Sequence, residues 1–323
     1  MAYKWCRLAA AVAILTGLFA LVRFHRYDDH TQPATPSPGL TKPVPSEDEV
    51  DWSTFAYTQY VTNSAYLCNS VMSFEALHRL SSRVDRVMMY PSEMLQSGDD
   101  SSSDARLLIK ARDEYSVKLV PIAVQYGHRL DQTWAESYTK LLAFNQTQYS
   151  RVLSIDSDSM LLQDMDELFL LPPSPVAMLP RAYWLYPDKQ TLSSQLMLIQ
   201  PSAVEFSRIM TKIESSSRDD YDMEIVNYLY RNSALIIPHR RYDMLTGEFR
   251  NDDHAMYLGS DREVWDPIGI YNELKLIHFS DWPLPKPWLY TPEDLIKTMQ
   301  PKCTNSTGSS TKSAVLALCE SNF

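Results

Sequence analysis

Two carboxylates follow an apolar run in the middle of the chain, and their spacing suits a divalent cation. Asp156 and Asp158 stand two positions apart where the run 151–155 ends. Residues two apart on a strand project to the same face, and a slight turn there lets both carboxylates meet one ion. Mg²⁺ or Mn²⁺ bound in this way keeps open positions for a substrate diphosphate. A solvent-exposed acidic loop is the plainer interpretation of such a pair, but its place at a strand end favours the metal site.

A second group of residues near the C-terminus could complete this site. His278 follows another apolar run, 274–277, and Lys286 stands eight positions later in a proline-stiffened aromatic loop, 282–288. A lone histidine is more often structural than a ligand. Together, however, His278 could be the third metal ligand and Lys286 a point charge on a phosphate. The two segments therefore predict one phosphate-metal site built from distant parts of the chain.

Two other chemistries could use the acidic pair. A calcium-binding loop is excluded, because Met160 offers no oxygen ligand and Leu161 occupies the position that requires glycine. A phosphatase of the haloacid dehalogenase type would use Asp156 as nucleophile and Asp158 as acid or base. The segment 260–266 resembles the second, metal-binding motif of those phosphatases, although their nucleophile strand usually opens the fold. The phosphatase therefore stays as an alternative.

Composition narrows the classes of protein further. The 323 residues include 40 acidic and 30 basic side chains, a net charge of −10, so no nucleic-acid partner is expected. Only eight glycines are present, and none has the spacing of a dinucleotide-binding, P-loop or nucleophile-elbow motif. The four cysteines form no CxxC pattern, which argues against a structural zinc site.

The elements that must position these residues alternate along the chain. Apolar runs rich in β-formers predict strands, and apolar residues at helical spacing predict helices between them. We expect strands at 55–61, 84–90, 117–122, 152–155, 196–200 and 235–238, and helices at 65–80, 104–115, 134–144, 203–213 and 223–230. This order predicts a single α/β domain with a mostly parallel central sheet and helices on both faces. Ligands of such sheets bind beyond the carboxyl ends of the strands.

Over roughly residues 55–290, these features resemble the retaining nucleotide-sugar transferases of glycosyltransferase family 8, the glycogenin-like group. Within that family the chain looks most like a fungal, Golgi-anchored N-acetylglucosaminyltransferase branch. The resemblance implies a Rossmann-like nucleotide-sugar-binding domain of GT-A type. It also implies Mn²⁺ (or Mg²⁺) as the cofactor and a UDP-sugar as the donor.

The resemblance assigns roles by position. The segment that matches the family's uridine-binding first strand contains Tyr60, Thr62, Asn63 and Tyr66. The matching metal ligands are Asp156, Asp158 and His278, and the cations that match those on the donor are Lys140 and, on the diphosphate, Lys286. These nine positions are the expected donor and metal site.

Two segments depart from the family pattern where the family lines the donor sugar. The family usually has Asn-Ser-Gly where this chain has Ser193, Ser194 and Gln195, and Asp222 is kept whereas the Gln-Gly after it is not. We expect Asp222 to position the donor sugar or the incoming hydroxyl, and we expect Ser193 and Lys286 to be further catalytic residues, with Lys286 on the phosphates. No covalent nucleophile is expected, because the resemblance implies front-face displacement with retained configuration.

The function expected from this resemblance is transfer of a sugar, with N-acetylglucosamine as first choice, from a UDP-sugar to a glycan. A mannose-containing glycan is one candidate acceptor. A non-catalytic lumenal glycan-binding protein of the same fold is the alternative outside enzymes. Such a protein would be expected to have lost a carboxylate or the histidine of the metal site, and all three are present.

The N-terminal segment predicts a membrane anchor. Residues 8–22 are uncharged and almost all apolar. An uncleaved signal-anchor is favoured over a signal peptide, because cleavage after Ala20 would place Leu18 where a small residue is required. We expect a cytosolic tip and anchor helix at 1–26, a Pro-rich stalk at 27–52, the transferase domain at 53–300 and a tail at 301–323. This layout is typical of secretory-pathway enzymes, and together with the resemblance it implies a single-pass type II protein of the Golgi membrane with a lumenal catalytic domain.

The glycosylation sequons and the cysteines also concern the expected lumenal location. Asn145 and Asn305 each begin an N-glycosylation sequon. Cys303 and Cys319 could form a disulfide in an oxidising lumen. Cys68 lies in an apolar helical stretch and is expected to be a buried free thiol.

Overall fold

The computed structural model describes residues 50–96, 100–125, 136–172, 176–186, 188–217 and 219–299. The chain divides into two compact units, Met1–Val50 and Asp51–Phe323, and the fold described below belongs to the second. The predicted anchor, most of the stalk and the tail with Cys303, Asn305 and Cys319 lie outside the described residues. None of the helices in the described part of the chain has the length and apolar character needed to cross a membrane.

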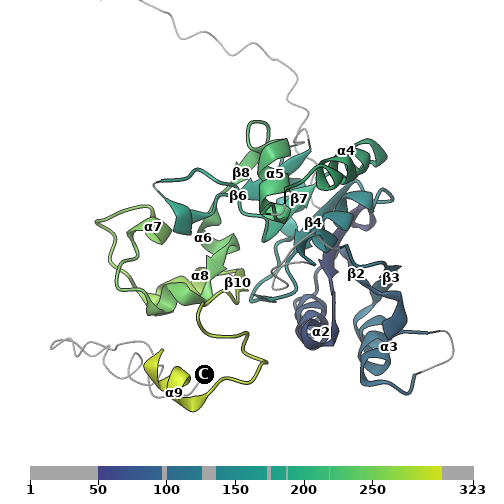
Figure 1. Cartoon of the computed structure of the whole chain (residues 1–323), viewed down its shortest axis with the longest axis horizontal. Coiled ribbons are helices and arrows are strands. Elements are labelled where there is room, and N and C mark those ends of the chain that lie inside the picture. The colour runs from purple at the N-terminus through teal and green to yellow at the C-terminus, as the bar shows by residue number, and fades with distance from the viewer. Residues whose placement is uncertain are drawn as a thin grey trace, which may run out of the picture. The chain divides into compact units, whose positions relative to one another are not determined.

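A seven-stranded sheet forms the centre of the fold, in the order β3-β2-β1-β4-β7-β6-β8 (Figure 1). Its strands are β1 (Phe55–Tyr60), β2 (Asp85–Pro91), β3 (Val117–Ile122), β4 (Arg151–Ile155), β6 (Ala177–Pro180), β7 (Leu196–Ile199) and β8 (Leu235–Ile237). The pairs among β3, β2, β1 and β4 are parallel, as is β6 with β8, whereas β7 runs antiparallel to both of its neighbours. The mostly parallel central sheet is therefore confirmed.

Helices cover both faces of this sheet, and alternate strand residues point to each. The longer helices are α2 (Ser64–Arg79), α3 (Ser103–Tyr115), α4 (Ala203–Glu214) and α5 (Asp222–Tyr230), with the 3₁₀ helix η4 (Ser137–Asn145). On one face, Leu153 of β4 joins a core with α2 and α3. On the other face, the preceding Val152 joins a core with η4, α4 and α5. This two-sided burial explains why the central strands read as continuous apolar runs.

Three very short strands form a second sheet beside the first, in the order β5-β10-β9. They are β5 (Ser159–Leu161), β9 (Met244–Leu245) and β10 (Leu276–His278). A third apolar core, with Tyr183, Tyr257 and Ile277 among its members, packs against this sheet. The short helices are α6 (His239–Tyr242), α7 (Ala255–Leu258), α8 (Pro267–Glu273), α9 (Glu293–Thr298), η2 (Trp52–Thr54), η3 (Ser92–Met94), η5 (Asp166–Leu170), η6 (Tyr183–Leu185) and η7 (Thr246–Arg250).

Two local expectations were wrong. The helix expected at 134–144 is described as the 3₁₀ helix η4, whose buried residues include Tyr138, Lys140 and Phe144. Because buried side chains surround this segment instead of forming one stripe, tertiary contacts rather than an amphipathic face set its winding. Cys68 is a free thiol, but it is exposed. Its neighbours Leu67 and Asn69 turn inward, which leaves Cys68 on the outer face of α2.

Candidate active site

The predicted metal ligands come together at the junction of the two sheets. Asp156 follows β4 directly, and β10 pairs antiparallel with β5 so that His278 lies opposite Ser159, next to Asp158. The His278 Nε2 atom lies 3.0 Å from Asp158 Oδ1 and 3.5 Å from Asp156 Oδ2. One potential ligand atom from each of the three residues lies within 4.8 Å of the others. Two carboxylates and an imidazole at this spacing are a donor set that Mn²⁺ accepts.

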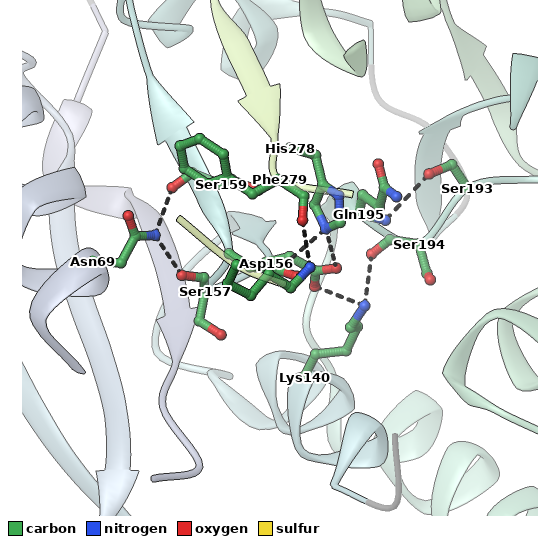
Figure 2. A network of polar contacts seen from close by, with 12 residues as sticks. Asn69, Lys140, Asp156, Ser157, Ser159, Ser193, Ser194, Gln195, His278 and Phe279 are labelled. Carbon is green, nitrogen blue, oxygen red and sulfur yellow. Dashed lines mark hydrogen bonds and ion pairs between the residues drawn. The ribbon is translucent and has the colours of Figure 1, made fainter. Parts of the chain in front are cut away.

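The backbone of the acidic turn is fixed by side chains that the sequence analysis did not single out. Asn69 of α2 donates from Nδ2 to the carbonyl oxygens of Ser157, at 2.6 Å, and Ser159, at 2.9 Å (Figure 2). Gln59 of β1 donates to the carbonyl oxygen of Asp156 at 2.8 Å. Asn69 and Gln59 could have been identified in the sequence, because each is a polar residue within an otherwise apolar segment and buried polar groups need hydrogen-bond partners.

Lys140 of η4 contacts Asp156 on the side of the site where Ser194 lies (Figure 2). Its Nζ atom lies 2.7 Å from Asp156 Oδ1 and 2.8 Å from Asp222 Oδ2, and only 4% of the residue is exposed. The Ser194 hydroxyl donates to Asp222 Oδ2 at 2.6 Å. Burial alone would lower the pKa of Lys140, but the carboxylates of Asp156 and Asp222 raise it above its ordinary value. Lys140 is therefore a permanent cation that links the predicted metal ligand Asp156 to Asp222.

Lys286 reaches into the site from the loop that follows β10. Its Nζ atom lies 2.6 Å from Asp158 Oδ2 and also donates to the carbonyl oxygen of Phe279. Burial would raise the pKa of Asp158, but His278 and Lys286 lower it far below its usual range. Burial would likewise lower the pKa of His278, but Asp158 and Asp156 raise it to about 9. His278 is therefore protonated at neutral pH in the protein without metal.

The charges around the acidic turn balance. Three carboxylates (Asp156, Asp158 and Asp222) face three cations (Lys140, Lys286 and protonated His278). A divalent ion bound to Asp156, Asp158 and His278 would replace the imidazole proton and release Lys286 from Asp158, two positive charges for two. The arrangement therefore suits a site that exchanges Lys286 and a proton for a metal ion.

Of the residues predicted to line the donor sugar, Ser193 and Ser194 lie in the segment before β7. Ser193 is fully buried, and its hydroxyl accepts a hydrogen bond from the backbone amide of Gln195 at 3.3 Å. Asp243, which the sequence analysis missed, is also fully buried beside β9, and burial raises its pKa to about 7 against the opposing effect of the Ser193 hydroxyl. Asp243 precedes a strand of two residues, too short a pattern to mark it in the sequence.

The predicted uridine residues lie at the carboxyl end of β1 and the start of α2. Burial and the nearby Asp156 and Asp158 raise the pKa of Tyr60, which ends β1 beside the acidic turn. Tyr66 is partly buried, and its ring meets Trp288 edge-on with centroids 5.8 Å apart. Asn63 caps α2 by accepting from the Ala65 amide at 3.0 Å. A surface cavity of about 360 Å³ is lined by Thr62, Asn63, Ser64, Glu93, Met94, Ser102 and Asp104.

The segment that resembles a phosphatase motif takes no part in this site. Asp261 is exposed, Glu263 pairs with Arg240 at 2.8 Å, and Asp266 caps α8 by accepting from the Ile268 amide. Within the described ranges, the cluster of potential metal ligands contains only Asp156, Asp158 and His278. The structure thus does not bring a second aspartate motif to the acidic pair.

Comparison with solved structures identifies the type of fold. The chain is similar to the bifunctional glycosyltransferase WbbM, with a TM-score of 0.52 and 13% identity, covering 72% of this chain and 46% of that one. It is also similar to an active-site mutant of LgtC, with a TM-score of 0.50 and 13% identity, covering 72% of this chain and 89% of that one. These likenesses show the fold, which is of the predicted GT-A-like type.

Comparison with curated proteins shows the family. No family model matches the chain. It is 64% identical to glucose N-acetyltransferase 1 of Gibberella zeae over 260 residues, which cover 79% of this chain and 57% of that protein. It is 49% identical to glucose N-acetyltransferase 1 of Aspergillus fumigatus over 282 residues, covering 83% of this chain and 73% of that protein. The chain thus spans little more than half of the first relative and nearly three quarters of the second. The chain belongs to the glucose N-acetyltransferase 1 family.

Proposed function

We propose that this protein is a retaining glycosyltransferase that moves N-acetylglucosamine from a UDP-sugar to a hydroxyl of a glycan. The observation that carries the proposal is the convergence of Asp156, Asp158 and His278 with Lys140 and Lys286 in one balanced charge cluster. The names of the relatives and the fold support the transferase class. The donor set supports Mn²⁺ as the cofactor.

In this proposal, different residues of the chain bind the metal, the diphosphate and the uridine of the donor. Asp156, Asp158 and His278 would hold Mn²⁺, which when bound neutralises the departing diphosphate. With Asp158 engaged by a metal ion, Lys286 would be free to pair with a phosphate oxygen of the donor. Tyr66 and the cavity lined by Thr62 and Asn63 offer a stacking surface and polar groups for the uridine.

Asp222 positions the transferred sugar in this proposal. Its Oδ2 atom is held by Lys140 at 2.8 Å and by the Ser194 hydroxyl at 2.6 Å. A carboxylate held in this way is suited to orient a sugar hydroxyl or the incoming acceptor hydroxyl, and it is poorly suited to attack carbon. Ser193, the fully buried neighbour of Ser194 in the chain, is assigned to the same donor-sugar segment. These contacts support front-face displacement without a covalent intermediate.

The membrane and compartment assignments are part of the same proposal. Asn145 is exposed at the end of η4, so its sequon is accessible for glycosylation in a lumenal body. The apolar run 8–22 supplies the anchor. We therefore place the catalytic body in the Golgi lumen, with a glycan as acceptor and mannose-containing glycans as the first ones to test.

A pair of variants tests the proposed chemistry. Asp158→Asn removes one charge from the metal site, and we expect it to abolish Mn²⁺-dependent hydrolysis of UDP-N-acetylglucosamine while the far-ultraviolet circular dichroism spectrum stays unchanged. Asp261→Asn is the matched control, because it changes an exposed aspartate in the phosphatase-like segment. A protein that hydrolyses a phosphate monoester, traps phosphate on Asp156 and depends on Asp261 would instead be a phosphatase.

A further inference from the structure

Two aromatic side chains near the active site lie almost wholly in solvent. Trp282 is 89% exposed and Tyr290 is 88% exposed, more than any other large apolar side chain in the described part of the chain. Single exposed apolar residues are ordinary on protein surfaces. Two large rings on one loop are less so, because tryptophan and tyrosine are the residues that binding surfaces most often employ.

The loop that carries these rings is held firmly in place. Asp281, just before Trp282, pairs with Arg250 through both carboxylate oxygens, with Arg250 Nε 3.1 Å from Asp281 Oδ2. The Leu284 amide donates to the Asp281 carbonyl at 2.8 Å, which closes a turn around Trp282. Trp288 packs edge-on against Phe279, with ring centroids 5.6 Å apart. The exposed rings are therefore presented by an anchored, proline-rich loop, so little conformational freedom is lost when a ligand binds.

The loop begins and ends in the active site. His278 and Lys286 both contact Asp158, and the seven residues between them leave the site and return to it. Trp282 is the midpoint, four residues from each, so its Cα atom lies within about 14 Å of theirs. Tyr290 is likewise four residues beyond Lys286. Both rings thus lie within a few sugar lengths of the place where the donor diphosphate would be held.

The chemistry of the loop favours an uncharged, hydroxyl-rich ligand. Its charged side chains are paired, Asp281 with Arg250 and Lys286 with Asp158. The exposed groups are aromatic faces, which stack against the C–H face of a pyranose ring, while Trp and Tyr also offer a donor at the ring edge. Asp281 is therefore satisfied by Arg250, and Lys286 is assigned to the donor diphosphate in the proposed function, so neither is left to bind a charged acceptor.

We propose that Trp282 and Tyr290 form a stacking surface for the acceptor glycan, binding sugar units next to the one that receives the transferred sugar. This inference rests on the proposed glycosyltransferase function and names its acceptor-binding residues. The surface differs from the donor and metal site in residues and in ligand. Its loss should therefore weaken glycan binding and leave chemistry on the donor intact.

The test uses the full chain, loaded with Mn²⁺ and UDP, on an array of neutral glycans of increasing length, manno-oligosaccharides included. We expect Trp282→Ala to weaken binding of the glycans that the wild type retains about tenfold, and more for longer than for shorter glycans. Trp282→Phe should keep most of the binding, and Tyr290→Ala should weaken it as well. Tyr228→Ala, which removes a 70% exposed ring on α5, is the matched control and should change nothing.

Two results would overturn the inference. One is wild-type protein that binds no glycan on the array, and the other is binding that Trp282→Ala leaves unchanged. Reduced sedimentation of Trp282→Ala with phosphatidylserine vesicles, with glycan binding intact, would assign the rings to a membrane surface instead. Hydrolysis of UDP-N-acetylglucosamine is measured on the same preparations. Its absence from the wild type would reject the proposed function, whereas normal hydrolysis with unaltered glycan binding would reject this inference alone.

Discussion

At the scale of single residues, the active site is a set of charges that satisfy one another before any ligand arrives. Lys140 is tied to two carboxylates and cannot leave without exposing them, so it is a fixed part of the site. Lys286 and the proton on His278 are the exchangeable charges, because each contacts Asp158 from a different side. This difference between fixed and exchangeable cations leads to two predictions.

Metal binding should depend on pH through His278. The pKa of His278 is raised to about 9, so below that pH a metal ion must displace a proton from the ring. We therefore expect Mn²⁺ affinity to rise about tenfold per pH unit between pH 6.5 and 8.5 and to level off above pH 9. Calorimetric titrations in two buffers of different ionisation enthalpy should show release of about one proton per ion. Equal affinity across this range would contradict a protonated His278.

Lys286 should oppose the metal and favour the nucleotide. In Lys286→Ala, Asp158 loses its cationic neighbour, so we expect Mn²⁺ alone to bind at least as tightly as in the wild type. UDP in the presence of Mn²⁺ should bind about tenfold more weakly, because one charge-assisted hydrogen bond to the diphosphate is gone. Lys275→Ala, which removes a lysine paired with Glu167, is the control for charge alone. Parallel losses of metal and nucleotide affinity would place Lys286 elsewhere in the reaction.

At the scale of elements, the site depends on short segments that long ones hold in place. The acidic turn between β4 and β5 is held by Asn69 of α2, and the imidazole reaches it only because β10 pairs with β5. The long strands and α2 to α5 follow from apolar periodicity and could be predicted. The second sheet could not, because strands of two or three residues carry no period. Asp243, which precedes one of these strands, was missed for the same reason, whereas Asn69 and Gln59 were missed because their importance lies in contacts with residues distant in the sequence.

Substitution of Asn69 tests whether α2 holds the acidic turn in place. Asn69→Ala removes two hydrogen bonds to the buried carbonyl oxygens of Ser157 and Ser159. We expect the free energy of unfolding to fall by about 1–3 kcal/mol. We also expect Mn²⁺ affinity to fall about tenfold, because loss of the groups that hold metal ligands in place typically weakens metal binding by at least that factor. Chemical denaturation and metal titration measure the two effects. Cys68→Ala, the exposed neighbour on α2, should alter neither, and unchanged Mn²⁺ affinity in Asn69→Ala would show that the turn holds its shape unaided.

At the scale of the whole molecule, the site occupies the place that the topology provides. The chain builds β1, β2 and β3 outward in one direction and then returns to place β4 on the other side of β1. Ligands of open α/β sheets bind at such a reversal, beyond the carboxyl ends of the strands. Tyr60 ends β1 and Asp156 follows β4, so the predicted nucleotide and metal residues meet there. The second sheet then places His278 at the site, and the loop after β10 brings Lys286 to it.

The central claim is that metal and nucleotide share one site built from Asp156, Asp158, His278 and Lys286. Calorimetric titration of UDP into the full chain, with saturating Mn²⁺ and again in EDTA, tests it most directly. We predict tight binding with Mn²⁺ and at least a hundredfold weaker binding in EDTA, because without the metal Lys286 stays paired with Asp158 and the described residues of the site offer no free positive charge to the diphosphate. Equal UDP affinity in Mn²⁺ and EDTA would contradict the claim.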